Sequence, residues 1–496
     1  MKFARIYLLL TRLIPFLIVA LILSLCLHAG WQLKADLGGD ATQNFLSSYN
    51  FYSSFEYGHH LGQAGFRREP LPNWTLAFFL WLFYRPAIGL SREEVLSNQE
   101  ILDAAVMVNI FWALILFLSL WLLARKVFVN TFTADISASF SILVSHFAFV
   151  RTEYDNLNTE LVASALFVVL ALSLLYAMNA QSFFSYVAVG LAFGLLVLTK
   201  ASGAYIALVT MPLIAFVTAN GFSMSPSGLA AKCMKRLLLI AIGFALVVSP
   251  WVLRNYSEFG EATIAQGGGR VLWIRSEFNK INRDQYIGAF YAYSPRLLRE
   301  SIWEPYFGYR ASQLQCGGDL QLHNRGEVCD IEHLEAGRFE DVVSLYERGK
   351  KALPLQAKAQ AAQSGAPYDV DKLGKEEFFA TVRQKPLDHL FLSIPLAWRG
   401  IWSFSIPDHF GTVPGLALNF AIMVNLIFIP ILALFYGDKI LLLMSLVPAS
   451  YFWFYALLSQ FWPRFSEPFI PVASLIFCYT ISTLIKAFRQ RNLLKA

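Results

Sequence analysis

Long apolar runs recur along the chain, and short polar segments separate most of them. Ten runs approach the roughly 20 residues that a helix needs to cross a bilayer. They lie at residues 6–29, 101–124, 134–150, 160–178, 184–199, 202–218, 237–253, 415–436, 440–458 and 467–486. Two shorter runs lie at residues 74–84 and 389–404. The pattern predicts an all-α polytopic membrane protein with about ten transmembrane helices.

Positive charge indicates which runs cross, because cytoplasmic loops carry an excess of Lys and Arg. If the two shorter runs do not cross, the basic clusters all fall on one side; they are Lys2, Arg5 and Arg12, then Arg125 and Lys126, then Lys232, Lys235 and Arg236, then Lys439 and the tail. If either run crossed alone, the later clusters would change sides. We therefore predict two juxtamembrane helices on the outer face and cytoplasmic termini.

The first run resembles a signal peptide in position but not in length. Its apolar stretch of about 20 residues is longer than a signal h-region, and no clean cleavage site follows it. We expect a retained transmembrane helix there, in a bacterial inner (plasma) membrane; an endoplasmic reticulum location stays open.

Three outer segments follow from this topology: residues 30–100, residues 151–160 and a loop of about 130 residues. The sequence then divides into a transmembrane module at 1–255, a small soluble periplasmic domain at 256–387, and a juxtamembrane helix with the last spans at 388–496. No repeated block suggests the paired halves of a transporter.

Composition agrees with a membrane protein. The chain is 56% hydrophobic and 15% charged, with a mean hydropathy of +0.49 and a formal net charge of +6. The positive charges are spread over short loops, so we expect no nucleic-acid partner. Cys316 and Cys329 share one polar loop, where they could pair in an oxidising compartment or stay as free thiols.

Ionisable residues gather at the outer ends of the spans, and in an apolar chain such residues are functional candidates. The acids are Asp40, Glu69, Glu153, Asp155 and Glu160, and the cations are Lys200, Arg254 and Arg464. A carboxylate can take a proton from an acceptor hydroxyl. Fixed positive charge can stabilise a departing phosphate, which Arg holds bidentately and Lys holds as a point charge.

The order of motifs resembles the membrane-embedded type C glycosyltransferases, the superfamily of protein O-mannosyltransferases and of the lipid A aminoarabinose transferase. The matching stretches are "GGDATQNF" around Asp40, "RREPLPNW" around Glu69, Gly190 through Lys200, "PWVLRNYSEFG", "GGGRVLWI" and Arg464 to Pro471. The family often has two adjacent acids in its first loop, whereas Ala41 follows Asp40 here. We find no match for residues 275–375.

The resemblance implies transfer of a sugar from a polyprenyl-phosphate donor to a lipid, glycan or protein acceptor. Asp40 would be the catalytic base, and Arg254, Arg464 and Lys200 would bind the donor phosphate. The substrate pocket would take Glu69, either Asp155 or Glu160, and Tyr256. Some members of the wider superfamily use a divalent metal, but the single acid at Asp40 does not argue for one, so we expect no cofactor.

Simpler interpretations compete with these roles. Asp40 could be the N-cap of a helix that begins at Ala41. Glu69 could pair with Arg67 or Arg68 on a wet surface, and Arg254 could mark the membrane boundary. Gly267 to Gly269 could be a flexible loop, or a backbone that closes over a substrate. His59 and His60 are expected to be surface histidines rather than metal ligands.

Two other functions stay open from the sequence. A transporter or flippase of lipid-linked sugars would place its ionisable residues near the bilayer midplane, whereas here they lie at the ends of the spans. A non-catalytic member of the same fold that binds lipid phosphate would account for the missing second acid.

Overall fold

The computed structural model describes residues 2–219, 226–365, 368–404 and 412–493, and within these ranges all regular structure is helical. Two units can be distinguished. The first comprises residues 1–265, 421–451 and 467–496, and the second comprises residues 266–420 and 452–466. Two of the four boundaries between them fall inside α22 (Val413–Tyr436) and α23 (Lys439–Leu458).

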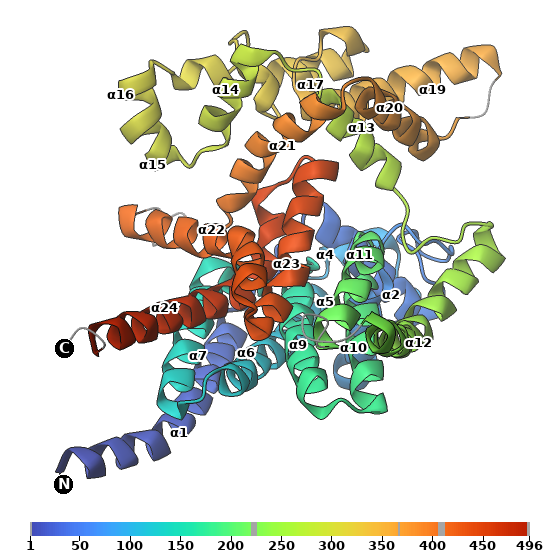
Figure 1. Cartoon of the computed structure of the whole chain (residues 1–496). Coiled ribbons are helices and arrows are strands. Elements are labelled where there is room, and N and C mark those ends of the chain that lie inside the picture. Colours follow the sequence, from blue (N-terminus) through green and yellow to red (C-terminus); the bar gives the residue numbers. More distant parts are fainter. Residues whose placement is uncertain (1, 220–225, 366–367, 405–411, 494–496) are drawn as a thin grey trace. The chain divides into compact units, whose positions relative to one another are not determined.

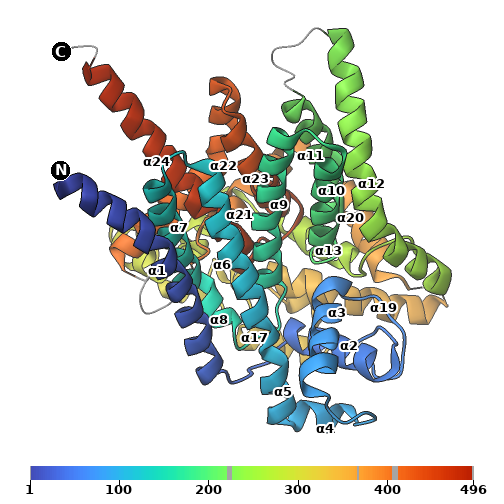
Figure 2. The ribbon, with the colours of Figure 1, turned by 90° about the horizontal axis from the view of Figure 1, so that it is seen from below.

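The first unit holds most of the long helices (Figures 1 and 2). They are α1 (Lys2–Gln32), α6 (Val108–Val127), α7 (Thr131–Ser145), α9 (Glu160–Ala180), α10 (Phe183–Val197), α11 (Gly203–Thr218), α12 (Pro226–Phe259) and α24 (Ile470–Leu493). Its shorter helices are α2 (Asp40–Ser54), α3 (Pro70–Phe79), α4 (Arg92–Ser97), α5 (Gln99–Val106) and α8 (Arg151–Glu153), with π turns η1 (Leu80–Tyr84) and η2 (His146–Val150).

Eight helical segments of the described chain are long and apolar enough to cross a membrane, so the protein is an integral membrane protein. They are Leu13–Gly30, Gln99–Val127, Thr131–Glu153, Glu160–Ala180, Gly228–Phe259, Val413–Tyr436, Lys439–Leu458 and Pro463–Asn492. All eight coincide with runs expected from the sequence. The other two expected spans form α10 and α11, apolar helices of 15 and 16 residues.

The spans of the first unit pack side by side. Helix α6 lies between α7 and α9, α10 packs against both α9 and α12, and α24 packs against α7 (Figure 2). The closest crossing is that of α10 with α12. A Cβ at Gly190 would run into the backbone of Ile240 and Gly243, and one at Gly243 would run into that of Val187. Small residues allow helices to approach this closely.

The two shorter apolar runs are helical but are not among the eight candidate spans. Residues 74–84 form the end of α3 and the turn η1. Residues 389–404 contain most of α21 (Pro386–Ile401), which has 16 residues. Their expected place on the outer membrane face stays a prediction.

The second unit is a succession of short helices (Figure 1). Besides α21 they are α13 (Gly268–Phe278), α14 (Arg283–Tyr293), α15 (Arg296–Leu298), α16 (Glu304–Phe307), α17 (Val328–Glu335), α18 (Leu345–Glu347), α19 (Leu353–Ser364) and α20 (Val370–Gln384). The remaining turns are η3 (Arg299–Trp303), η4 (Ala311–Leu314), η5 (Gln321–His323), η6 (Phe339–Asp341), η7 (Arg348–Ala352) and η8 (Pro463–Phe469).

Glycines decide how α13 meets α20 in this unit. The carboxylate of Asp371 accepts hydrogen bonds from the backbone N–H groups of Gly267 and Arg270, at 2.8 and 3.1 Å. It therefore caps the N-terminus of α13, which is favourable for a negative charge. A Cβ at Gly269 would overlap the backbone of Asp371. The glycine run thus serves a capped helix start and a close helix crossing.

Cys316 and Cys329 form a disulfide bond in the second unit. The bond closes the polar loop whose two cysteines the sequence left either paired or free.

Candidate functional site

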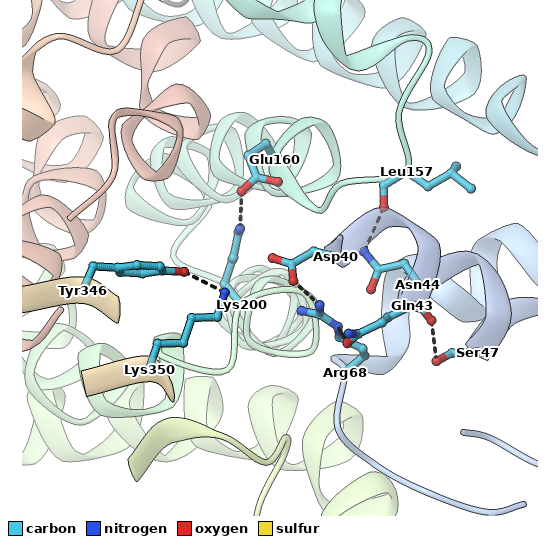
Figure 3. A network of polar contacts seen from close by, with 10 residues as sticks. All are labelled: Asp40, Gln43, Asn44, Ser47, Arg68, Leu157, Glu160, Lys200, Tyr346 and Lys350. Carbon is cyan, nitrogen blue, oxygen red and sulfur yellow. Dashed lines mark hydrogen bonds and ion pairs between the residues drawn. The ribbon is translucent and has the colours of Figure 1, made fainter. Parts of the chain in front are cut away.

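Asp40 is the first residue of α2 rather than its N-cap. Gly39 occupies the N-cap position, with a φ of 52°, and the helix starts at Asp40 without a side-chain cap. The Asp40 carboxylate instead forms an ion pair with Arg68, as Figure 3 shows. The side chain of Asp40 keeps 43% of its surface exposed, so it is paired yet accessible.

Gln43 completes this arrangement. It lies one turn after Asp40 on α2, and its Oε1 accepts a hydrogen bond from Arg68 Nε at 3.0 Å (Figure 3). Arg68 is thereby held by two side chains of the same helix face. In the sequence, Arg68 appeared only as a possible partner of Glu69, and no motif singled out Gln43.

Lys200 and Glu160 form a second ion pair. Lys200 lies in the turn between α10 and α11, and its Nζ is 3.0 Å from Oε1 of Glu160 at the start of α9 (Figure 3). The two side chains are 13% and 3% exposed. Burial strengthens the attraction but removes both charges from water, so each depends on its partners.

Glu69 connects the two ion pairs. It follows Arg68 directly, and its Oε1 accepts a hydrogen bond from the backbone N–H of Ala201 at 3.3 Å. Of the two arginines that could pair with Glu69, Arg68 forms its ion pair with Asp40, and a pairing of Glu69 with Arg67 stays a prediction. Adjacent residues and direct contacts thus link Asp40 to Glu160 through Arg68, Glu69 and Lys200.

Further contacts hold the segments that carry these residues. Asn44 Nδ2 donates to the carbonyl of Leu157 at 2.8 Å, and Leu71 N–H donates to the carbonyl of Leu198 at 3.1 Å. Residues 33–74, 151–160 and 198–203 therefore meet at one end of the first unit, and we call them the polar rim.

Asp155 ties the start of the polar rim together. Its carboxylate accepts a hydrogen bond from Lys34 N–H at 3.1 Å, and its carbonyl accepts one from Asp36 N–H at 2.9 Å. Burial raises the pKa of the Asp155 carboxyl, which the Lys34 hydrogen bond counteracts and the nearby Asp103 and Asp36 reinforce. Of the two acids left open by the sequence, Glu160 binds Lys200, whereas Asp155 binds backbone.

Arg254 reaches the same end of the unit from α12. Its Nη1 donates to the carbonyl of Gly65 at 3.0 Å, and its Nη2 is 2.7 Å from Oε2 of Glu258. The guanidinium carbon lies 4.9 Å from the ring centre of Trp251 and 5.1 Å from that of Phe259. Arg254 is therefore fixed next to the first loop, with an exposed acid as its ionic partner.

Tyr57 explains why residues 55–74 hold their shape. It is buried, and its hydroxyl donates to the carbonyls of Arg68 and Glu69, at 3.1 and 2.9 Å, while it accepts from Asn73 Nδ2 at 2.6 Å. Burial raises the pKa of Tyr57, so it stays a neutral donor. Its position in the sequence carried no signal of this role.

The remaining two candidates, Tyr256 and Arg464, are exposed. Tyr256 is 61% exposed. Arg464 belongs to the second unit, where it is exposed and its guanidinium carbon lies 5.8 Å from the ring centre of Phe465. The expected meeting of Arg464 with Asp40 stays a prediction.

Neighbouring histidines do not gather with acids or cysteines. The rings of His59 and His60 lie 4.1 Å apart, and burial lowers the pKa of His59 to about 4. In the described part of the chain, no three His, Cys, Asp or Glu side chains come close enough to share a metal ion.

A cavity of about 440 Å³ lies at the other end of α6, lined by Leu122, Arg125, Lys126, Leu172, Ser173, Tyr176 and Ala188. Arg125 is held there by Asp135, with Nε and Nη2 at 2.6 and 2.7 Å from the two carboxylate oxygens. None of the candidate residues lines this cavity.

No protein-family model matches the chain, and no curated protein matches it. Among solved structures, it is similar to the oligosaccharyltransferase AglB of Archaeoglobus fulgidus in complex with an inhibitory peptide and a dolichol-phosphate. The TM-score is 0.46 and the identity 16%, over 96% of this chain and 51% of AglB. This chain thus spans about half the length of AglB.

It is also similar to ArnT from Cupriavidus metallidurans bound to undecaprenyl phosphate, with a TM-score of 0.37 and 15% identity over 94% of this chain and 77% of ArnT. Both proteins are type C glycosyltransferases, the superfamily that the sequence motifs resemble.

Proposed function

We propose that the protein transfers a sugar from a polyprenyl-phosphate donor to an acceptor hydroxyl, at the outer, periplasmic face of a bacterial inner membrane. The observation that carries this proposal is the line of contacts at the polar rim. It joins an accessible carboxylate, Asp40, to a cation, Lys200, within a membrane protein. A base and a phosphate-binding charge are what this transfer needs.

Asp40 acts as the general base. It takes the proton of the acceptor hydroxyl while the acceptor oxygen bonds to the anomeric carbon of the sugar. The bond from that carbon to the phosphate oxygen breaks, and the electron pair leaves with polyprenyl phosphate. Arg68 holds the Asp40 carboxylate in place through their ion pair. Gln43 positions Arg68 and so acts through it.

Lys200 and Arg254 bind the phosphate. Negative charge grows on the leaving oxygen in the transition state, so positive groups held in place beforehand lower the barrier. Lys200 is held by Glu160, and Arg254 is held by Glu258 and two aromatic rings. Because Glu258 is 43% exposed, a donor phosphate can replace it on Arg254 while Glu258 moves into water.

The substrate pocket takes Glu69, Glu160 and Tyr256, with Asp155 as a support for its wall. Glu69 and Glu160 are half-buried and buried acids beside Lys200, where sugar hydroxyls could replace or extend their hydrogen bonds. Tyr256 presents an exposed ring two residues after Arg254. The donor sugar and the acceptor would be distinguished by these side chains.

Reconstituted protein tests the proposal. The purified protein is reconstituted in nanodiscs and incubated with a radiolabelled polyprenyl-phosphate hexose or pentose. Lipid, glycan and peptide acceptors are added in turn, and the labelled product is measured. We expect Asp40→Asn to lower the transfer rate by about 10²–10⁴-fold, the usual contribution of a general base. Asp36→Asn, an exposed acid in the same loop, is the matched control and should transfer at the wild-type rate.

Two outcomes count against this function. An Asp40→Asn variant that transfers sugar at the wild-type rate excludes Asp40 as the base. In sealed proteoliposomes, movement of the labelled donor across the bilayer without any transfer product would instead indicate a flippase.

We further propose that α10 and α11 cross the membrane as a hairpin, which gives ten spans and leaves both termini in the cytoplasm. The supporting contact is that of Ala201, at the hairpin turn, with Glu69 of the first loop. An Ala201→Cys variant should react with an impermeant maleimide added from the periplasmic side. Labelling only after the membrane is opened would mean that the hairpin does not cross.

A further inference from the structure

Three cations of the second unit interleave with three aromatic rings. Arg399 lies between Trp462 and Tyr293, with its guanidinium carbon 3.5 and 4.5 Å from their ring centres. Arg325 lies 4.8 Å from the Trp462 ring centre and 5.1 Å from that of Tyr346. Lys350 Nζ donates to the Tyr346 hydroxyl at 2.8 Å, a contact drawn in Figure 3. We call these six residues the cation–aromatic stack.

Among the described residues, no carboxylate forms an ion pair with Arg399, the most buried cation of the stack. Arg399 is 7% exposed, and its Nη1 donates a long hydrogen bond of 3.5 Å to the carbonyl of Gln460. Burial lowers its pKa to about 10, so it remains charged at neutral pH. Aromatic faces attract a cation but do not neutralise it. A buried charge normally has an ionic partner, because losing water is costly.

Polar atoms around Arg399 also lack partners. Trp462 Nε1 and Gln460 Oε1 are buried and make no hydrogen bond within the described residues. Buried polar groups are nearly always hydrogen-bonded, so unpaired ones point to a missing partner. An indole N–H can only donate, which suits an anion's oxygen.

Nearby acids are engaged elsewhere. Glu327 accepts a hydrogen bond from Asn324 at 2.7 Å, and Glu347 lies 3.0 Å from Lys351 Nζ. Within the described ranges, neither Arg325, Arg399 nor Lys350 forms an ion pair with a carboxylate. Buried His323 adds no charge at neutral pH, because burial lowers its pKa to about 4.

The two arginines are close enough to share one ligand. The guanidinium carbons of Arg325 and Arg399 lie 4.8 and 3.5 Å from the centre of the same ring, that of Trp462. The two carbons are therefore at most about 8.3 Å apart. Like charges at this distance repel each other, and an anion between them would remove the repulsion. Guanidinium groups bind phosphate oxygens bidentately, which makes a phosphate the best-suited anion.

The disulfide keeps Arg325 in its place. Arg325 lies inside the loop that Cys316 and Cys329 close. The loop is fixed to the segment before Tyr346, since Ser344 Oγ donates to the carbonyl of Asn324 at 2.6 Å. Because the disulfide and this hydrogen bond restrict the loop, Arg325 has little conformational freedom to lose when a ligand binds. A smaller entropic cost favours binding.

We propose that the cation–aromatic stack binds a phosphate ester, carried either by a phosphorylated saccharide or by a lipid headgroup. The oxyanion contacts the edges of Arg399 and Arg325 and accepts the Trp462 N–H, and Lys350 adds charge at the outer side. The site gives the second unit a binding role of its own. It does not depend on the transfer reaction proposed for Asp40.

Equilibrium dialysis of the full chain in dodecyl maltoside, which has no phosphate, tests the proposal. The probes are radiolabelled glucose 1-phosphate for the saccharide source and dioctanoyl phosphatidic acid for the headgroup source, with glucose as the uncharged control. We expect one of the phosphates to bind and glucose not to bind. Arg325→Gln should weaken that binding about tenfold, the range for losing one charged hydrogen bond.

Arg283→Gln is the matched control, because Arg283 is another exposed arginine of the same unit. It should bind the probe as the wild type does. Arg399→Lys keeps the charge but loses the planar donor pair, so it should also weaken binding, with the Cys316–Cys329 bond as a check of folding. Asp40→Asn should bind normally even where it cannot transfer sugar. Absence of binding for both phosphates, or wild-type binding by Arg325→Gln, would overturn the proposal.

Discussion

Gly269→Ala tests whether the glycine run at residues 267–269 is structural. The added methyl group would overlap the backbone carbonyl of Asp371, and α20 cannot move it aside as a side chain could be moved. The opposite glycine, Gly374, has the same constraint, because its Cβ would overlap the Gly269 carbonyl. The two helices must therefore separate, and the hydrogen bonds of Asp371 to Gly267 and Arg270 would weaken.

The magnitude follows from the cost of overpacking. Inserting a methyl group into a well-packed contact typically costs about 1–3 kcal/mol, and a backbone obstacle places this site at the upper end, about 3 kcal/mol. A unit of this size loses about 2–4 °C of its unfolding temperature for each kcal/mol. We therefore expect the second unit of Gly269→Ala to unfold about 6–12 °C below that of the wild type.

Gly268→Ala is the matched control. It lies in the same first turn of α13, and a Cβ there would meet nothing within 4 Å. Replacing a helical glycine by alanine is favourable by about 0.5–1 kcal/mol, so this variant should be as stable as the wild type or slightly more.

Purified full-length variants are heated in steps and then treated briefly with trypsin, and mass spectrometry follows cleavage in residues 266–420. If Gly269→Ala resists heat as well as Gly268→Ala but loses sugar transfer, the structural interpretation is wrong. The glycine run would then act on the substrate.

Three further predictions concern buried charge, pH and the disulfide. Lys200→Met should destabilise the first unit by about 3 kcal/mol, because it removes a cationic partner of buried Glu160. The double variant with Glu160→Gln should recover part of this loss. Equal stability of the single and the double variant would contradict this prediction. Burial lowers the pKa of His323 from 6.5 to about 4, so this side chain binds fewer protons in the folded than in the unfolded chain. The free energy of unfolding should therefore fall as the pH drops below 6.5, by about 2 kcal/mol at pH 5. Unfolding curves of His323→Gln that change as much between pH 7 and pH 5 would exclude this contribution. Reducing the Cys316–Cys329 bond should cost about 3 kcal/mol in the second unit, and denaturant midpoints that do not change on reduction would refute it.

The hydrophobic pattern was sufficient to locate the long apolar helices. Apolar length is a local property, so the runs at residues 101–124 and 160–178 are found as α6 and α9 without knowledge of any partner. Apolar length alone does not decide whether α10 and α11 cross the membrane, because both helices are shorter than a usual span. The close packing of α10 depends on Gly190 and on Ile240 and Gly243 of α12, which lie at least 50 residues further along the chain.

The candidate site also has features that the sequence shows and features that only the structure shows. Charged residues at the ends of apolar runs are visible in the sequence, and they include Asp40, Glu160 and Lys200. Which acid meets which cation is not visible, because Asp40 pairs with Arg68 across 28 residues and Lys200 with Glu160 across 40. The partner of Asp40 therefore had to come from the folded chain.

The sequence by itself determined which segments are apolar enough to cross a membrane, because transfer from water into lipid depends on each segment's own side chains. Only the tertiary structure decided which polar groups satisfy one another. A buried charge or hydrogen-bond donor is stable only beside a partner, and packing brings those partners together from distant parts of the chain.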